Sequence, residues 1–535
     1  MEELDKRTKL TIMLAIAASM LFAALNQTIV GTALPRIIAE LGGMEYYSWV
    51  FTAYMLTASV TGLLVGKLSD MYGRKPFILA GLLIFMVGAF LSGTSTTITQ
   101  MIIYRAIQGF GGGFIMSTAF TAVGDLFPPR ERGKWQGLLS AIFGLASVVG
   151  PVLGGYIVDH MAWKWVFWVN LPIGVIAFLL IWRLFPKIVG NAGAKIDYAG
   201  AVFVTGILVP LLLAFSWAGS KYEWGSGTII SLLVASVICL IIFLFVEKRA
   251  EAPVLPLGLF RNSIFNVSNI VGFLTGVAMF GSIMYIPLFV QGVIGTSAAQ
   301  SGLVTMPMMI ALVVGSMIAG QITSRTGRYK WLAVLGSAIL CVGLYMLTLM
   351  DINSTNAEAS IDMIVVGAGL GFTMPVFMLA VQNALPQNMM GVASASTQLF
   401  RQIGGTVGVS IMGTVLSNSI KDQMTANMPP EVGKFLATPG IKEHATDLMN
   451  PQLLMAPDKL AEFRDKLPAP LHTVFDQLIS TLQSAMAVGL ADVFQLAFYL
   501  SIAGLVVTFL LKEIPLRTSN RDEAAKAVNA EPERS

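Results

Sequence analysis

Two arginines in this sequence lie inside long apolar stretches, where a positive charge is costly. Arg105 stands a few residues into the stretch 101–123, and Arg401 lies well inside the stretch 391–416. A cation at the centre of a membrane-spanning helix costs about 2.5–3.5 kcal/mol on insertion scales, so it normally faces a polar cavity or a partner. Both arginines are therefore candidate functional residues. For Arg105, hydrogen bonding to carbonyls near the end of its helix is a simpler alternative.

Asn26 is a third polar residue in an unusual place, near the middle of the apolar stretch 11–34. A buried carboxylic acid at such a place can take up and release a proton near neutral pH, whereas an asparagine cannot. No Asp or Glu lies deep in any other apolar stretch. The nearest carboxylates all stand at the ends of stretches, namely Asp125, Asp159, Asp197, Glu247, Asp362 and Asp492.

The sequence offers little for enzymatic chemistry. His160, His444 and His472 lie far apart, and neither an HExxH motif nor a paired-carboxylate motif occurs. Cys239 and Cys341 lie inside apolar stretches, where a thiol behaves as a small hydrophobe. We therefore expect no catalytic residues, no metal site and no cofactor, and an intramembrane enzyme is the weaker alternative. Net charge is only +4, without basic clusters that include aromatic residues, so we expect no nucleic-acid partner.

The elements that hold these residues are membrane helices. Of 535 residues, 55% are hydrophobic and 12% are charged, and an apolar run of about 20 residues spans a bilayer as a helix. The sequence predicts an all-α membrane protein with 14 transmembrane helices. They are 11–34, 46–66, 77–98, 101–123, 135–158, 165–182, 198–219, 225–246, 264–290, 299–323, 331–350, 363–385, 391–416 and 493–511.

Basic residues predict the orientation of these helices. If the N-terminus is cytoplasmic, the inward segments hold most of them, as the positive-inside rule requires. These residues are Lys6, Arg7, Lys9, Lys67, Arg74, Lys75, Arg130, Arg132, Lys134, Arg183, Lys187, Lys195, Lys248, Arg249, Arg261, Arg325, Arg328, Lys330 and those from Lys512 onward. We expect a multi-pass protein of the cell (cytoplasmic) membrane, with both termini in the cytoplasm and an uncleaved first helix.

An internal repeat divides the chain. The link 66–75 reads GKLSDMYGRK and the link 320–330 reads GQITSRTGRYK, with Gly66, Gly73 and Arg74 at the offsets of Gly320, Gly327 and Arg328. If the seventh and eighth helices are an insertion, each link joins the second and third helix of a six-helix half. Parallel repeats of this kind place a substrate site between the halves. A general preference of short cytoplasmic turns for Gly and Arg is the alternative.

This repeat predicts the domain organisation. We expect an N-terminal six-helix bundle over 1–190, two inserted helices with linkers over 191–263, a C-terminal six-helix bundle over 264–512, and a cytoplasmic tail over 513–535. The second bundle contains a long extracytoplasmic loop, 417–490, whose residues Val474, Leu478, Leu482 and Met486 have helical spacing. They predict an amphipathic helix that lies on the membrane or caps the bundle. A solvated connector is the alternative.

Five segments resemble the motifs of the major facilitator superfamily. They are the signature loop Gly66–Lys75, the second motif Arg105–Gly109, the antiporter motif Gly150–Gly155, and the segments Trp163–Pro172 and Arg401–Gly405. The last two resemble the fourteen-helix drug:proton antiporter branch. The resemblance implies two six-helix bundles plus a central helix pair and alternating access. We expect Asn26, Arg105, Gln108 and Arg401 to belong to the substrate cavity or the proton-coupling site.

The resemblance also assigns a cytoplasmic gate. It implies that Asp70 and Arg74 belong to a network that closes the cytoplasmic side. We expect Gly73 of the same turn, and Asp125 and Arg132 in the charged cluster after the fourth helix, to belong to it as well. A solvated turn is the alternative. In the second copy of the link, Ser324 stands at the position of Asp70. We therefore expect the network to be asymmetric, with this carboxylate only in the first half.

The antiporter motif has physical consequences of its own. Ala146, Gly150 and Gly154 share one helix face, which lets another helix approach closely, and Pro151 can bend the helix. We expect Gly150, Pro151, Gly154 and Gly155 to form a packing surface and a hinge. A pure packing role is the alternative.

Proton coupling needs a titratable carrier, and Asn26 is not one. This branch usually has an aspartate where Asn26 stands, and there it is a candidate proton carrier. Either coupling uses a peripheral carboxylate such as Asp125, or Asn26 is a natural or engineered replacement that imitates the protonated acid.

We expect a monomeric secondary transporter that exports amphiphilic drugs or hydrophobic compounds by proton-coupled antiport. The 29 Met and 31 Phe residues suit an adaptable apolar cavity, although most of them are expected to face lipid or other helices. A lipid or glycolipid exporter of the same fold is the alternative, because Arg401 suits an anionic headgroup. A membrane sensor without transport is less favoured, because no soluble signalling domain is present.

Overall fold

The computed structural model describes residues 5–41, 47–186, 197–218, 222–250, 253, 255–296, 298–386, 389–436, 438, 448–449, 454, 457–465 and 467–516. In these ranges the protein is helical, with one isolated β-bridge between Ala218 and Tyr222. The N-terminal helices are α1 (Lys6–Leu41), α2 (Tyr47–Tyr72), α3 (Arg74–Thr94), α4 (Ile98–Leu126), α5 (Pro129–His160), α6 (Trp165–Trp168) and α7 (Leu171–Leu184). The inserted pair is α8 (Tyr198–Trp217) and α9 (Gly227–Arg249).

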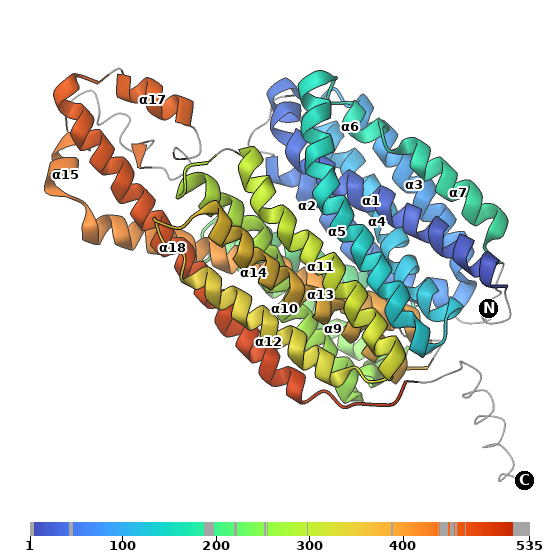
Figure 1. Ribbon diagram of the computed structural model, residues 1–535. Helices are drawn as coiled ribbons and strands as arrows, with labels where there is room; N and C mark the ends of the chain where they lie inside the picture. Colours follow the sequence, from blue (N-terminus) through green and yellow to red (C-terminus); the bar gives the residue numbers. More distant parts are fainter. Residues whose placement is uncertain are drawn as a thin grey trace, which may run out of the picture.

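The remaining helices follow the short 3-10 helix η2 (Leu257–Arg261). They are α10 (Ser263–Gly292), α11 (Ala298–Thr326), α12 (Lys330–Thr348), α13 (Asn356–Ala384), α14 (Met390–Asn427), α15 (Pro430–Leu436), α17 (Pro457–Asp465) and α18 (Ala469–Phe509). Figure 1 shows that the N-terminus and the end of α18 lie at the same end of the bundle, which we call the terminal side.

The helices match the predicted spans in number and order. Among the described residues, 12 helical segments are long and apolar enough to cross a membrane. The two other predicted spans are also helices: α2, which contains the shorter apolar run Ala53–Gly66, and α5, which has 32 residues. The protein is therefore an all-α, multi-pass membrane protein with fourteen long helical passes, of which α6 and α7 together form one.

The two predicted six-helix halves contact each other through equivalent pairs of helices. α5, the fifth helix of the first half, packs along α11, the second helix of the other half. In the same way α2 packs along α14. Inside each half the pairing also repeats, since α2 packs on α4 and α11 on α13. The inserted helices α8 and α9 pack against each other, and α8 also contacts α2 and α14.

Glycines set the spacing between these helices. A Cβ at Gly109 of α4 would clash with the Tyr54 carbonyl of α2, and a Cβ at Gly404 of α14 would clash with the Phe273 carbonyl of α10. Small residues at such crossings let helix backbones touch, which is how membrane helices gain dispersion energy.

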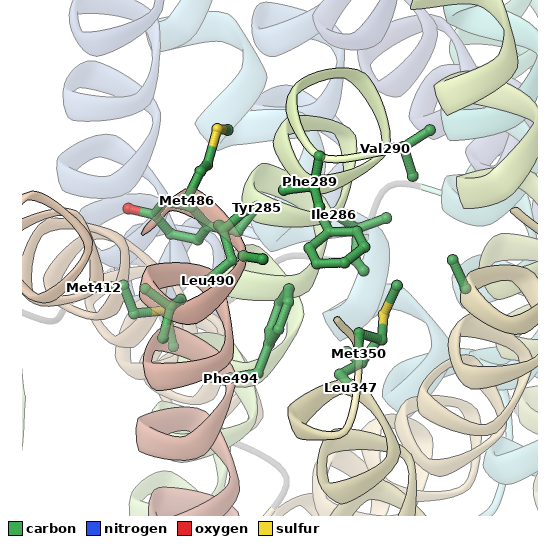
Figure 2. Close-up of a cluster of buried hydrophobic side chains, with 14 of the residues drawn as sticks. Tyr285, Ile286, Phe289, Val290, Leu347, Met350, Met412, Met486, Leu490 and Phe494 are labelled. Atoms are coloured by element: carbon green, nitrogen blue, oxygen red, sulfur yellow. The ribbon is translucent and has the colours of Figure 1, made fainter. Parts of the chain in front are cut away.

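The apolar core of the second half runs without a break toward the end of the molecule opposite the terminal side. Figure 2 shows Tyr285, Ile286 and Phe289 of α10 beside Met486, Leu490 and Phe494 of α18. The Tyr285 hydroxyl donates a hydrogen bond of 2.8 Å to the Val409 carbonyl of α14, so this buried polar atom is satisfied.

The segment 417–490 differs from the predicted loop. α14 continues to Asn427 and α18 begins at Ala469, so both helices extend beyond the predicted spans, with α15 and α17 between them (Figure 1). Leu478, Leu482 and Met486 are fully buried in the core of the second half, and Val474 packs against it. The predicted amphipathic helix is thus the first part of a 41-residue helix that continues through the bundle, neither a separate surface helix nor a solvated connector. The polar composition of the segment concealed this continuation. We call 417–490 the helical protrusion.

Candidate functional site

A buried polar cluster joins α1 and α4 in the first half. The Gln108 side chain donates from Nε2 to Asn26 Oδ1 at 2.7 Å, and Arg105 donates from Nη1 to the same oxygen at 3.4 Å. Arg105 also donates to Gln108 Oε1 at 2.7 Å, because residues three apart share one helix face. All three side chains are 0% exposed. The structure therefore brings together three of the four predicted cavity residues.

Arg105 also lies over an aromatic ring, a contact that the sequence did not indicate. Its guanidinium carbon lies 4.5 Å from the ring centroid of Tyr54 on α2. This cation–π contact stabilises a desolvated cation. Among the described residues Arg105 binds no helix-end carbonyl, so that simpler explanation for its position is wrong.

The cluster contains more donors than acceptors. Within the described part of the chain, Arg105 Nε, Arg105 Nη2 and Asn26 Nδ2 are buried without a hydrogen-bond partner. No described carboxylate forms a salt bridge with Arg105. A buried charge normally requires an opposite charge, because desolvation costs several kcal/mol per ion. The Arg105 guanidinium is therefore only partly compensated, by two amide oxygens and one ring.

A cavity lies between the two halves, directly beside this cluster. Its walls come from α1, α2, α4 and α5 of the first half and from α10, α11, α13 and α14 of the second, which are the same ordinal positions in each half. The volume is about 110 Å³, room for a few water molecules. Tyr54 contributes to the wall and also contacts Arg105.

Sulfur and aromatic side chains dominate the cavity wall. Its apolar lining includes Met20, Met55, Met116, Met279, Met309, Met374, Phe120, Phe143 and Phe280. Thioethers are flexible and polarisable, so such a wall can adapt to ligands of different shape. The expectation that some of the Met and Phe residues line a cavity is met by these nine, while Met284, Met317, Phe90 and Phe245 are among those exposed on the outer surface.

Arg401 reaches the cavity from the second half. It lines the wall on α14, half-buried, and donates to Gln398 Oε1 one turn earlier. It therefore lies on the opposite half from the Arg105 cluster, and its described hydrogen bond stays within α14. Met55 Sδ accepts from Gln27 Nε2 at 3.6 Å and from Gln402 Nε2 at 3.1 Å. Tyr54, Gln27 and Gln398 were missed as site residues, because an uncharged polar side chain in an apolar run is far less costly than a charge. Gln402 stands in the segment Arg401–Gly405 but was not singled out from it.

The predicted gating residues gather at the terminal side of the first half. Arg74 Nε lies 2.8 Å from Asp125 Oδ2, and Arg74 Nη1 donates to Ser69 Oγ at 2.6 Å. Gly73 has φ 89°, a conformation that favours glycine, and this turn directs Arg74 toward α4. Asp70 belongs to the last turn of α2 and not to a loop, and its side chain lies outside the described residues.

Arg132 connects the two halves at the same side. Its guanidinium donates to the carbonyls of Phe127 at 3.0 Å, Gly124 at 2.9 Å and Gln382 at 3.3 Å. The first two carbonyls lie at the C-terminal end of α4, where the helix dipole favours a cation. Gln136 of α5 adds a 2.7 Å hydrogen bond from Nε2 to Gln382 Oε1 of α13. Gln136 and Gln382 had no distinguishing sequence pattern.

The backbones of the two halves touch beside Arg132. A Cβ on Gly320 of α11 would clash with the Gly133 carbonyl of α5, and a Cβ on Gly137 would crowd the Ser316 carbonyl. On α2, a Cβ at Gly66 would crowd the Gly391 carbonyl of α14. The terminal side is thus closed by direct packing of helix on helix.

The second copy of the repeated turn is stabilised in another way. Gly327 has φ 70° and corresponds to Gly73. Glu513, after the end of α18, accepts from the Tyr329 N–H at 3.1 Å and the Lys330 N–H at 3.4 Å, at the N-terminus of α12. The Tyr329 hydroxyl donates to the Lys512 carbonyl at 3.1 Å. Burial raises the pKa of the Tyr329 phenol. In this second copy a carboxylate from the C-terminal segment therefore binds the turn. In the first copy Asp125 of α4 binds Arg74 of the turn.

The predicted hinge lies on the α1 contact of α5. A Cβ at Gly150 would clash with Thr28 Oγ1, and Thr28 donates to the Ala146 carbonyl at 2.8 Å. Gly154 is buried as well, while the side-chain surroundings of Pro151 and Gly155 lie outside the described residues. Close packing of this face is a feature of the structure, and a hinge role remains a prediction.

Comparison with known proteins agrees with this architecture. The family model described as Major Facilitator Superfamily matches residues 16–409. Multidrug transporter protein MdtP of Bacillus subtilis (strain 168) is 36% identical, over 98% of this chain and 98% of that protein. Multidrug resistance protein 3 of the same organism is 37% identical, over 77% of this chain and 80% of that protein. The solved structure of the proton:xylose symporter XylE has TM-score 0.61 at 11% identity, covering 98% of this chain and 100% of XylE, a likeness of fold alone.

Proposed function

The chain belongs to the major facilitator superfamily, and we propose that it is a secondary active transporter that exports amphiphilic drugs or hydrophobic compounds in exchange for protons. The main support is the cavity between the halves, whose wall is apolar, rich in methionine and shared by equivalent helices of both repeats. Such a wall binds compounds by burial of apolar surface and not by a fixed set of hydrogen bonds.

Alternating access is supported by the distribution of contacts between the halves. Drug-sized ligands need cavities of about 300–1,000 Å³, whereas this one has about 110 Å³. The halves must therefore separate for a substrate to enter. On the terminal side the separation breaks the contacts of Arg132 and Gln136 with Gln382, and of Gly133 with Gly320. Two rigid halves with a site at their interface are the arrangement expected for rocking.

For proton coupling we propose Asp125 as the carrier. Asn26 has no titratable proton, and Asp125 forms the ion pair with Arg74 where α2, α3 and α4 meet. Protonation of Asp125 would remove the charge that holds Arg74. Since Arg74 also binds Ser69 of α2, its release would loosen the end of the helix that packs on α14.

The test is substrate-dependent proton movement in sealed vesicles. Purified protein is reconstituted with a pH-sensitive dye inside, and an amphiphilic fluorescent drug is added with or without a pH gradient. We expect the drug to drive proton flux through the wild-type protein, and Asp125→Asn to bind drug without moving protons. Drug transport that is independent of the gradient would disprove antiport. Asp125→Asn with full proton flux would disprove the carrier assignment.

We also propose that the transporter resides in the cell membrane as a monomer with the terminal side in the cytoplasm. Labelling of single cysteines introduced at the terminal side, in intact cells, tests this orientation.

A lipid or glycolipid exporter is the second candidate function, since Arg401 in the cavity wall can bind an anionic headgroup.

A further inference from the structure

The cavity between the halves has an uncompensated positive charge. Arg401 is the only charged side chain among the described residues of its wall, and no described Asp or Glu lines it. Arg105 adds a second guanidinium behind Tyr54, again without a described carboxylate partner. A cavity meant for cations would be expected to hold an opposite charge, as buried charges are normally paired.

Arg401 is available to a ligand. It is half-buried on the wall, and among the described residues its guanidinium donates to Gln398. A guanidinium has five N–H donors arranged to bind the two oxygens of a carboxylate, sulfonate or phosphate. Gln398 and Gln402 also line the wall on the same helix and can donate to further oxygens.

We propose that the cavity selects amphiphilic anions: compounds with one carboxylate, sulfonate or phosphate group and an apolar body. The anionic group binds Arg401 of α14, and the apolar body packs among the methionines and phenylalanines of both halves. Arg105 acts through its field without touching the ligand. This inference rests on the proposed export function and specifies its substrate class.

Electrostatics gives the expected size of the preference. Consider a ligand whose unit charge lies about 8 Å from one guanidinium, at an effective dielectric constant of about 20. The affinity of this ligand for the cavity then differs roughly thirty-fold from that of a neutral compound. The effect has opposite signs for an anion and a cation. The two effects multiply to roughly a thousand-fold, so a preference of at least about tenfold for an anionic over a cationic ligand of the same shape is a low threshold for the test.

The experiment compares three dansyl probes that share one fluorophore and one hexyl chain and end in a sulfonate, a hydroxyl or a quaternary ammonium group. Binding to the full-length purified protein is measured by fluorescence, and transport by uptake into reconstituted vesicles. We expect the sulfonate probe to bind at least about tenfold more tightly than the ammonium probe. Equal affinities, or tighter binding of the ammonium probe, would overturn the inference while the export function stands. If no probe binds, the export function and the substrate class both fail.

Variants of Arg401 locate the headgroup. Arg401→Gln should lower the sulfonate-to-hydroxyl affinity ratio at least about tenfold, whereas Arg401→Lys, which keeps the charge, should retain most of it. Because both values of each ratio come from the same preparation, a partly unfolded variant does not alter the ratio. A Gln variant with the wild-type ratio would overturn the assignment of Arg401.

Vesicle composition separates a lipid headgroup from a soluble anion. The sulfonate probe is titrated in phosphatidylcholine vesicles with or without phosphatidylglycerol. If phosphatidylglycerol raises the apparent Kd by competition at constant ionic strength, the anionic group in the cavity can come from a lipid. An unchanged Kd assigns the site to soluble amphiphilic anions.

Discussion

Arg105 of α4 lies 3.4 Å from Asn26 of α1, measured from Nη1 to Oδ1, at a depth where neither side chain is exposed to solvent. The pair joins the first and fourth helices of the first half, beside the Tyr54 ring that also forms the cavity wall. An amide at this place accepts a hydrogen bond but has neither charge nor titratable proton. The electrostatic balance of the cavity therefore depends on residue 26.

Asn26→Asp is expected to strengthen proton-driven export. The new carboxylate would pair with the Arg105 guanidinium and could gain and lose a proton as its surroundings change between states. The measurement is drug export in an imposed pH gradient. Asn26→Ser is the control, because it alters the cluster without adding a titratable group. Export that is already full in the wild-type protein and unchanged in Asn26→Asp would show that coupling does not involve this position.

The Arg74–Asp125 pair is expected to stabilise the terminal side. A double-mutant cycle with Arg74→Gln and Asp125→Asn should give a coupling energy of about 1–2 kcal/mol, because the side chains are only 6% and 12% exposed. Arg464 and Asp476 in the helical protrusion are the control pair: their Nε–Oδ1 distance is 3.0 Å, but they are 44% and 53% exposed. Solvent screens a pair this exposed, so its coupling energy is expected to be the smaller of the two. Denaturant unfolding measures both cycles, and equal coupling energies would contradict the structural role of the first pair.

Gly320→Ala should open the terminal side. The added Cβ would clash with the Gly133 carbonyl of α5, and overpacking of this kind costs about 1–3 kcal/mol, or about five- to 150-fold in the population of the closed state. Gly302→Ala, on the same helix, is the control, since a Cβ there meets nothing within 4 Å.

The readout is maleimide labelling of Ser316→Cys, a buried position at the same contact, after replacement of Cys239 and Cys341. Gly320→Ala should speed labelling and Gly302→Ala should not. Equal labelling rates in the two variants would mean that the contact between α5 and α11 does not hold the terminal side closed.

Glu513→Gln should destabilise the second half by about 0.3–1 kcal/mol, because an exposed carboxylate at the N-terminus of α12 would be replaced by a neutral acceptor. The measurement is the unfolding midpoint in detergent. Lys512→Gln is the control, since Lys512 accepts the hydrogen bond from the Tyr329 hydroxyl through its backbone carbonyl. A midpoint lowered equally by both changes would indicate a general effect of charge.

The sequence predicted the passes well because hydropathy depends on each residue alone. It identified Arg105 and Asn26 as polar residues in apolar surroundings, and Gln108 as part of the motif Arg105–Gly109. Their mutual contacts could not be predicted from spacing, since Asn26 and Arg105 are 79 residues apart and meet only when α1 and α4 pack. The repeated Gly-Arg turn indicated two halves, and the equivalent packing of α5 on α11 and of α2 on α14 has the same symmetry.

Other features had no sequence signal. Tyr54, Gln136 and Gln382 look like ordinary residues in apolar helices, and only packing gives them partners. The extension of α14 and α18 was hidden by polar composition, since helices outside lipid need only one apolar face. The carboxylate of Glu513 reaches α12 from 183 residues away, a distance that no local pattern can report.

The 41-residue helix α18 amplifies rotations of the second half, because it is long and packs in that half. At 1.5 Å per residue it extends about 60 Å without interruption, from the helical protrusion to the terminal side. A small tilt of the second half would therefore sweep its far end through several ångströms. A fluorophore placed at that end would report movements of the second half from a point far from the cavity, and a binding protein that holds the helical protrusion in place would restrict those movements.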